Sequence, residues 1–140
     1  NDFVTHNLRD GALDILKTEG VKEENIKLYK VPGAFELNFA SMQLCKEGIF
    51  DAVIAIGCVI RGETPHFDYV CSAVAQGIKD CNILTDVPTI FCLLTDDSKE
   101  QSIARSGGNL GNKGVEAAVT ALQMIDFKKN LSAKVEKVGF

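Results

Sequence analysis

A single short segment holds most of the side chains that could do chemistry. It runs from Cys58 to His66 and reads Cys-Val-Ile-Arg-Gly-Glu-Thr-Pro-His. Gly62, Glu63 and Thr64 stand where a helix should begin, so their main-chain N–H groups and one hydroxyl could hold an anion such as phosphate. Thr64 could instead only cap that helix, since Thr before Pro is a common cap. Glu63 would repel a phosphate unless its carboxylate points away.

His66 offers proton transfer near neutral pH, because an imidazole can both accept and donate a proton there. It falls in the first turn of the predicted helix. The positive end of the helix dipole disfavours the imidazolium, which keeps the ring available as a base. The alternative is a surface histidine without a chemical role.

Three further positions could contribute to a site. Phe35 and Glu36 are adjacent and suit a polyhydroxylated ring ligand through stacking and hydrogen bonds, although Phe35 could belong to the core and Glu36 could only favour a helix start. Arg105 could bind phosphate through two parallel hydrogen bonds, or could merely favour the end of a helix. Cys58 could be a nucleophile, but it lies at a strand end without an obvious base. The sequence contains no P-loop, dinucleotide-binding glycine motif or Ser-His-Asp arrangement.

Alternating strand and helix patterns must position these residues. The expected strands are Ile26–Val31, Ala52–Ile56 and Pro88–Leu94. The first expected helix runs through Leu8–Leu16, with Thr5 or Asn7 as its cap and Gly20 at its end. Further helices are expected from Phe35 to about Gly48, after Thr64-Pro65, and, as a short one, from Ser98 to Arg105. A glycine-rich break at Ser106–Asn112 then precedes a long helix from Lys113 to about Lys129. This order predicts an α/β fold with three α/β/α layers around a parallel sheet. Ligands of such sheets bind beyond the carboxyl ends of the strands.

Composition narrows the class of protein. A chain of 140 residues corresponds to one domain of roughly 100–200 residues. Its net charge of −4 argues against a binder of nucleic acid or of anionic membranes, which needs a basic face. The longest apolar stretch, Ala52 to Ile60, has nine residues and is too short to span a bilayer.

The cysteines and histidines argue against a metal site. The five cysteines include no Cys-x-x-Cys pair, and the two histidines lie far apart in the sequence. An odd number of cysteines indicates free thiols in a reducing cytosol. We expect each cysteine to be a small buried hydrophobic residue, with Cys58 as the one open case.

Three segments resemble the signature segments of the lumazine synthase family. They begin at Val31-Pro32-Gly33-Ala34-Phe35-Glu36, at Gly57-Cys58-Val59-Ile60-Arg61-Gly62 and at Gly111-Asn112-Lys113-Gly114. The resemblance covers residues 1–131 of a single domain, 1–140, and leaves 132–140 as a tail. It implies a flavodoxin-like sheet and the condensation of 5-amino-6-(D-ribitylamino)uracil with 3,4-dihydroxy-2-butanone 4-phosphate, without a metal or an organic cofactor.

The resemblance also implies residue roles. His66 would transfer protons, Phe35 would stack near the pyrimidine and Glu36 would bind the ribityl hydroxyls. The phosphate-binding residues would be Gly62, Glu63, Thr64 and Arg105. The substrate-binding residues would be Asn1, Ala34, Phe35, Glu36, Cys58, Val59, Ile60, Phe91, Lys113 and Glu116. Among these, Phe91, Lys113 and Glu116 match positions that line the site from an adjacent subunit.

Members of this family form pentamers or 60-mer shells, so the resemblance implies at least a homopentamer. It also implies a location in the cytoplasm, or in an organelle after removal of a transit peptide.

The sequence departs from the family pattern in two places: the family has a strand ending in an aromatic residue before the position of Asn1, and the tail passes the usual helix end. Two other functions stay open. One is a flavodoxin-like module that binds flavin or nucleotide, and the other is an inactive, shell-forming scaffold.

Overall fold

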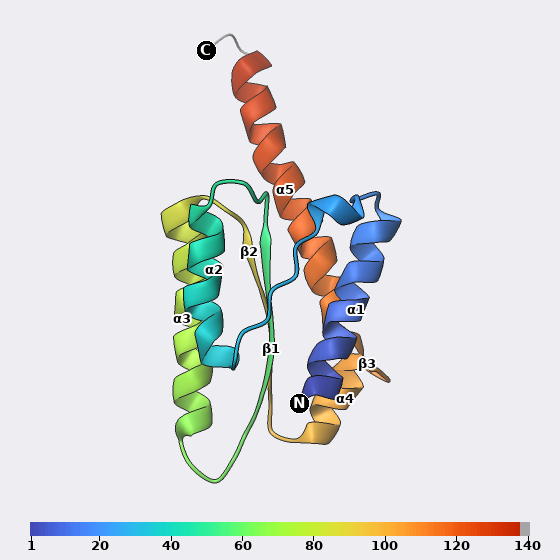
Figure 1. Ribbon diagram of the computed structural model, residues 1–140, viewed down its shortest axis with the longest axis vertical. Helices are drawn as coiled ribbons and strands as arrows, with labels where there is room; N and C mark the ends of the chain where they lie inside the picture. The colour runs from blue at the N-terminus through green and yellow to red at the C-terminus, as the bar shows by residue number, and fades with distance from the viewer. Residues whose placement is uncertain (138–140) are drawn as a thin grey trace.

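Two parallel strands, β1 (Val53–Ile60) and β2 (Thr89–Asp96), form the centre of the structure (Figure 1). The computed structural model describes residues 1–137. One face of the strand pair is covered by α2 (Leu37–Lys46) and α3 (His66–Thr85), and the other face by α1 (Asp2–Thr18) and α5 (Lys113–Lys137). The predicted α/β fold with helices on both sides of a parallel sheet is therefore confirmed.

Side-chain alternation along the strands builds two separate cores, as a strand covered on both faces requires. β1 and β2 run in register from Val53 opposite Thr89 to Ile60 opposite Asp96. On one face, Ala55 and Leu93 pack with residues of α2 and α3. On the other face, even-numbered strand residues pack against α1 and α5: Ile54, Ile56, Ile90, Cys92 and Leu94.

The prediction of a strand at Ile26–Val31 is wrong. Its first residue is extended, with φ −107° and ψ 118°, but the segment pairs with no strand in residues 1–137. Leu28 and Tyr29 are exposed, so a strand pattern here has neither a hydrogen-bonded neighbour nor a covered face to stabilise it. β1, in contrast, is longer than expected, because it includes Cys58, Val59 and Ile60, which lie beyond the strand expected at Ala52–Ile56.

Helix ends were predicted with mixed success. Gly20, with a φ of +91°, lies just beyond α1 as expected. The proposed caps Thr5 and Asn7 are wrong, because both lie inside α1 and its cap is Asn1. In α4 (Lys99–Arg105) the cap is Ser98, whose hydroxyl accepts a hydrogen bond from the Gln101 N–H, as predicted. α5 passes the expected end near residue 129 and takes up part of the predicted tail, whose residues 138–140 lie outside the described chain.

A small hairpin of β3 (Ser106–Gly108) and β4 (Gly111–Asn112) occupies the glycine-rich break and fixes the start of α5. The Asn112 side-chain oxygen accepts hydrogen bonds from the N–H groups of Gly114 at 2.8 Å and Val115 at 3.3 Å. Its amide nitrogen donates to the Asn7 carbonyl at 3.1 Å. One asparagine thereby caps α5 and attaches it to α1.

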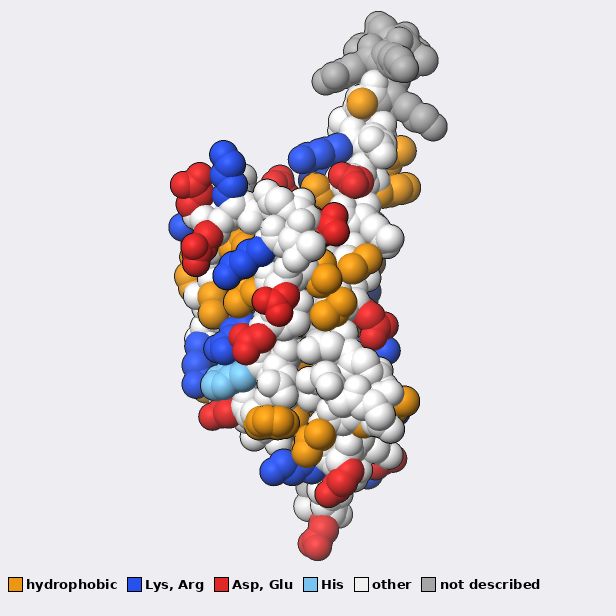
Figure 2. Space-filling model, turned by 90° about the vertical axis from the view of Figure 1, so that its right-hand side faces the viewer, with side chains coloured by type: hydrophobic (Ala, Val, Ile, Leu, Met, Phe, Trp, Pro, Cys, Tyr) orange, Lys and Arg blue, Asp and Glu red, His pale blue; other side chains and the backbone are white. Residues whose placement is uncertain are grey.

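The outer surface is mixed in character. Figure 2 shows acidic and basic side chains interspersed over the face built by α1 and α5. The C-terminal part of α5 projects beyond the other helices, and Phe127 and Leu131 are exposed on it. None of the described helices combines the length and the apolar character needed to cross a bilayer.

Candidate active site

The loop between β1 and α3 has the geometry expected of an anion site. α3 begins at His66 after Pro65, so the predicted helix start is correct. The Thr64 hydroxyl accepts a hydrogen bond from the His66 N–H at 3.4 Å, but the cap position of α3 is Pro65 and no side chain caps it, so the prediction of Thr64 as the cap is wrong. That hydroxyl keeps its own hydrogen for a ligand. No heavy atom stands within 4 Å of where a Cβ of Gly62 would lie, so a ligand could approach the main chain there.

Arg61 holds the start of this loop in place. The main-chain N–H of Arg61 donates to the main-chain carbonyl of Asp96 at 2.9 Å. Its guanidinium pairs with Asp97 at 2.8 Å and with Asp68 at 3.3 Å, and it lies over the Phe67 ring, 4.4 Å from the centroid. The two carboxylates, Asp97 first, raise the pKa of Arg61. The sequence alone does not predict this role of Arg61, because its partners Asp68 and Asp97 lie in two different segments of the chain.

Phe35 and Glu36 lie in a short 3₁₀ turn, η2 (Ala34–Glu36), directly before α2. Phe35 is 57% exposed, so the alternative that it belongs to the core is wrong. The Ala34 Cβ lies 3.8 Å from where a Cβ of Gly57 would stand, which sets this turn against the second half of β1. An exposed aromatic ring and a carboxylate therefore stand free for a ligand beside that strand.

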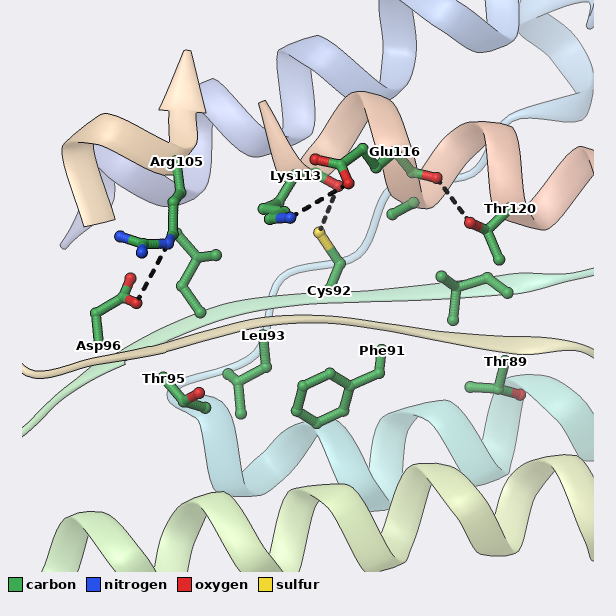
Figure 3. Close-up of a pocket in the computed structure, with 13 residues that line it drawn as sticks. Thr89, Phe91, Cys92, Leu93, Thr95, Asp96, Arg105, Lys113, Glu116 and Thr120 are labelled. Atoms are coloured by element: carbon green, nitrogen blue, oxygen red, sulfur yellow. Dashed lines mark hydrogen bonds and ion pairs between the residues drawn. The ribbon is translucent and has the colours of Figure 1, made fainter. Parts of the chain in front are cut away.

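A second group of candidate residues lines an open pocket of about 540 Å³ between β2 and α5 (Figure 3). Lys113 and Glu116, from the first turn of α5, form an ion pair of 3.2 Å. Arg105, at the end of α4, donates a hydrogen bond to the Gln101 carbonyl at 3.0 Å. Phe91 contributes to the lining from β2, but its ring points to the opposite face of the strand from the Cys92 side chain.

A buried polar chain connects β1 to this pocket. The Cys58 thiol donates to the Ser102 hydroxyl at 3.4 Å, and that hydroxyl donates to Asp96 at 2.8 Å. Asp96 in turn lies 3.9 Å from the Arg105 Nε (Figure 3). No motif marks Ser102 or Asp96 in the sequence; their only signal is that Asp96 ends β2 and Ser102 lies in the short helix that leads to Arg105.

Burial raises the pKa of the Cys58 thiol, so the thiolate needed for attack is disfavoured. Ser102 lowers that pKa, and Asp96 raises it. Cys58 packs against the cluster that holds Val4 and Leu8, so the start of α1 lies at the carboxyl end of β1. Cys58 therefore does not have the properties of an activated nucleophile.

The candidate residues thus fall into two groups on one chain. The first lies around the carboxyl end of β1: Asn1, Ala34, Phe35, Glu36, Cys58, Val59, Ile60, Gly62, Glu63, Thr64 and His66. The second lies in the pocket beside β2: Phe91, Arg105, Lys113 and Glu116. Cys58 of the first group is connected to Arg105 of the second group through Ser102 and Asp96. Residues 1–137 hold no group of three or more His, Cys, Asp or Glu side chains placed to bind a metal ion.

Comparison with known proteins identifies the relatives of this chain. The sequence profile of the 6,7-dimethyl-8-ribityllumazine synthase family matches residues 1–129. A 6,7-dimethyl-8-ribityllumazine synthase of Phocaeicola vulgatus is 52% identical over 131 residues, which are 94% of this chain and 78% of the relative. That of Parabacteroides distasonis is 54% identical over 127 residues, 91% and 79% of the two chains. That of Bacteroides fragilis is 51% identical over 132 residues, 94% and 92% of the two chains.

Proposed function

Since the chain belongs to the 6,7-dimethyl-8-ribityllumazine synthase family, whose members are transferases of riboflavin biosynthesis, we propose that it catalyses the reaction for which its relatives are named. It condenses 5-amino-6-(D-ribitylamino)uracil with 3,4-dihydroxy-2-butanone 4-phosphate to give the lumazine, phosphate and water. The observation that carries this proposal is an identity of 52% over 94% of the chain. The relatives favour neither a flavin-binding module nor an inactive scaffold.

The reaction asks little covalent chemistry of the protein. The ring amine attacks the ketone carbon and water leaves, which gives an imine. A proton is then removed and the phosphate leaves with the electron pair of its C–O bond. Loss of phosphate leaves an enol at the former hydroxyl-bearing carbon, and this enol tautomerises to a ketone. The ribityl-bearing nitrogen attacks this new carbonyl, and a second water leaves as the ring closes. Both substrates are reactive, so holding them together is the main contribution of the enzyme.

The residues of the first group have chemistry that suits these steps. Phe35 is exposed and can stack on the pyrimidine, while Glu36 can accept hydrogen bonds from the ribityl hydroxyls. Gly62, Glu63 and Thr64 precede the N-terminus of α3, which favours a phosphate. His66, at the first position of α3, moves protons between the amine, the imine and the leaving water.

The second group completes the site from a neighbouring subunit in this proposal. Arg105 lies in the pocket beside β2 and supplies a fixed positive charge for the phosphate, and Lys113 and Glu116 lie beside it. The match of Phe91, Lys113 and Glu116 to family positions that line the site from an adjacent subunit supports a homopentamer whose sites lie at subunit boundaries. We further propose that pentamers assemble into a 60-mer shell in the cytoplasm. Light scattering distinguishes monomer, pentamer and shell.

One assay tests the proposed activity. The purified protein is mixed with both substrates, and the absorbance of the lumazine is followed over the uncatalysed background. We expect a rate above background that requires both substrates and releases one phosphate per lumazine. No increase over background by the folded, assembled protein would contradict the proposal. A bound yellow cofactor without turnover would favour the flavin-binding alternative.

A further inference from the structure

Each cation in the pocket beside β2 lies next to a carboxylate. Lys113 pairs with Glu116 at 3.2 Å, and Arg105 lies 3.9 Å from Asp96. The Asp96 side chain is only 11% exposed. A fixed negative charge is therefore built in beside the arginine that the proposed function assigns to phosphate.

The distances distinguish what Asp96 does from what Gln101 does. The 3.9 Å between the Arg105 Nε and the Asp96 carboxylate is too long for a hydrogen bond. The hydrogen bond from Arg105 to the Gln101 carbonyl is 3.0 Å, so the main chain of α4 orients the guanidinium. Asp96 acts on Arg105 through charge, which is effective over this distance in a partly buried site.

Ser102 keeps the carboxylate from turning away. Its side chain is fully buried, and its hydroxyl donates to the second oxygen of Asp96 at 2.8 Å. The Asp96 main chain is also fixed, because its carbonyl accepts a hydrogen bond from the Arg61 N–H. An incoming phosphate therefore meets Arg105 with its counter-charge still in place.

We propose that Asp96 sets the phosphate affinity of the Arg105 site by offsetting part of the arginine charge. The site then binds the phosphate of the substrate weakly enough to release inorganic phosphate after the reaction. This inference rests on the proposed role of Arg105 as the partner of the phosphate.

The test measures inhibition by inorganic phosphate in Asp96→Asn. The amide has the shape of the carboxylate and can still accept the Ser102 hydrogen bond, so the substitution mainly removes charge. We expect the inhibition constant of phosphate to fall about three- to tenfold at low salt, and the gain to shrink as salt screens the site. An unchanged or raised inhibition constant would overturn the inference.

Two controls separate charge from structure. Asp80→Asn removes a half-exposed carboxylate of α3 that pairs with Lys79 and should leave phosphate inhibition unchanged; an equal fall there would overturn a local effect of Asp96. Ser102→Ala keeps the charge of Asp96 but loosens its attachment. It should not lower the inhibition constant, and a fall equal to that of Asp96→Asn would assign the effect to loosened packing and overturn the inference.

Arg105→Ala distinguishes failure of this inference from failure of the proposed function. If Arg105→Ala leaves phosphate inhibition unchanged, the assignment of Arg105 to phosphate is wrong, and the inference falls with it. If Arg105→Ala weakens phosphate inhibition while Asp96→Asn does not strengthen it, only the role of Asp96 is wrong. The double variant Asp96→Asn/Arg105→Ala should bind phosphate no more tightly than Arg105→Ala alone, because Asp96 changes the phosphate affinity only through the arginine.

Discussion

Gly114 lies directly against the main-chain carbonyl of Leu8, at the point where α5 meets α1. A Cβ at position 114 would overlap that carbonyl and would stand 2.9 Å from the Asn112 side-chain oxygen. The glycine therefore allows the two helices their close approach, while Asn112 caps the second helix and bonds to the first. In the Gly111-Asn112-Lys113-Gly114 motif, close packing at the glycine and capping by the asparagine thus fix the start of α5, and this places Lys113 at the pocket.

Gly114→Ala should destabilise the protein. Alanine favours a helix by about 1 kcal/mol over glycine, but overpacking against a main-chain carbonyl typically costs about 1–3 kcal/mol and cannot be relieved by a rotamer change. We expect a lower midpoint in urea unfolding. Asn130→Ala, at an exposed position of the same helix, is the control and should be neutral or slightly stabilising. Equal midpoints for Gly114→Ala and the unchanged protein would show that α1 and α5 can move apart at little cost.

His66→Ala should slow turnover without abolishing it. General acid–base catalysis contributes about 10²–10⁴-fold, whereas holding the reactive substrates together survives the substitution. The measurement is kcat at saturating concentrations of both substrates. His6→Ala is the matched control, since His6 is exposed on α1, and its kcat should be unchanged. Complete loss of turnover in His66→Ala with intact substrate binding would argue for a larger chemical role.

Arg105→Ala should chiefly raise the KM for the phosphate-bearing substrate, by about tenfold to a hundredfold for a lost charge-assisted contact. The KM for the pyrimidine should change little. Arg105→Lys should recover part of the loss, because it restores the charge but not the two parallel hydrogen bonds. Steady-state kinetics with each substrate varied in turn gives both constants. An unchanged KM for the phosphate-bearing substrate would remove Arg105 from the phosphate site.

Arg61→Met should weaken phosphate binding through the loop that it holds. The ion pairs with Asp97 and Asp68 are exposed, so their loss should change the stability of the protein little. The KM for the phosphate-bearing substrate should nevertheless rise several-fold, since the loop start is no longer held to α3 and to the end of β2. Arg9→Met breaks an exposed pair with Asp10 and should leave both KM values as they are. A raised KM for the pyrimidine alone would contradict this role for Arg61.

The buried thiols should make the protein less stable in alkali. Burial raises the pKa of Cys92 from 9.0 to about 12 and that of Cys81 to about 11. Below pH 9 these thiols are protonated in both states and their contribution to stability is complete. As the pH rises from 9 towards 12, the unfolded thiols ionise first and stability falls by up to about 1.4 kcal/mol per pH unit for each group. Urea unfolding between pH 8 and 11 measures this slope, and Cys92→Ala should reduce it. If the free energy of unfolding falls with pH at the same rate in Cys92→Ala and in the unchanged protein, Cys92 does not contribute to the slope.

Local hydrogen-bond chemistry is what the sequence predicts best. Ser98 caps α4 and Gly20 lies at the end of α1 as expected, because each acts within a few residues of itself. The strand predicted at Ile26–Val31 fails because a strand needs a neighbour, and β propensity carries no information about one. Thr5 and Asn7 were chosen as caps on residue type alone, although both lie inside α1.

The site follows the same rule. The order of Gly62, Thr64 and His66 along the chain predicts that a helix begins here, and α3 does begin at His66; anion binding by this loop stays a prediction. The clamp of Arg61 on Asp97 and the chain from Ser102 to Asp96 join separate elements. Such contacts depend on the register of β2 against β1, which no local pattern specifies.

The hydrogen bond from Asn112 to Asn7 spans 105 residues, so the contact between α1 and α5 is one of the last to form during synthesis. At roughly 5–20 residues per second of synthesis, α1 waits on the order of five to twenty seconds for its partner α5. The apolar face carrying Val4 and Leu8, fully buried at the end, packs on Leu94, Ile56 and Cys58, which are all synthesised before α5. The strand pair can therefore cover this face of α1 first, and α5 completes the layer afterwards.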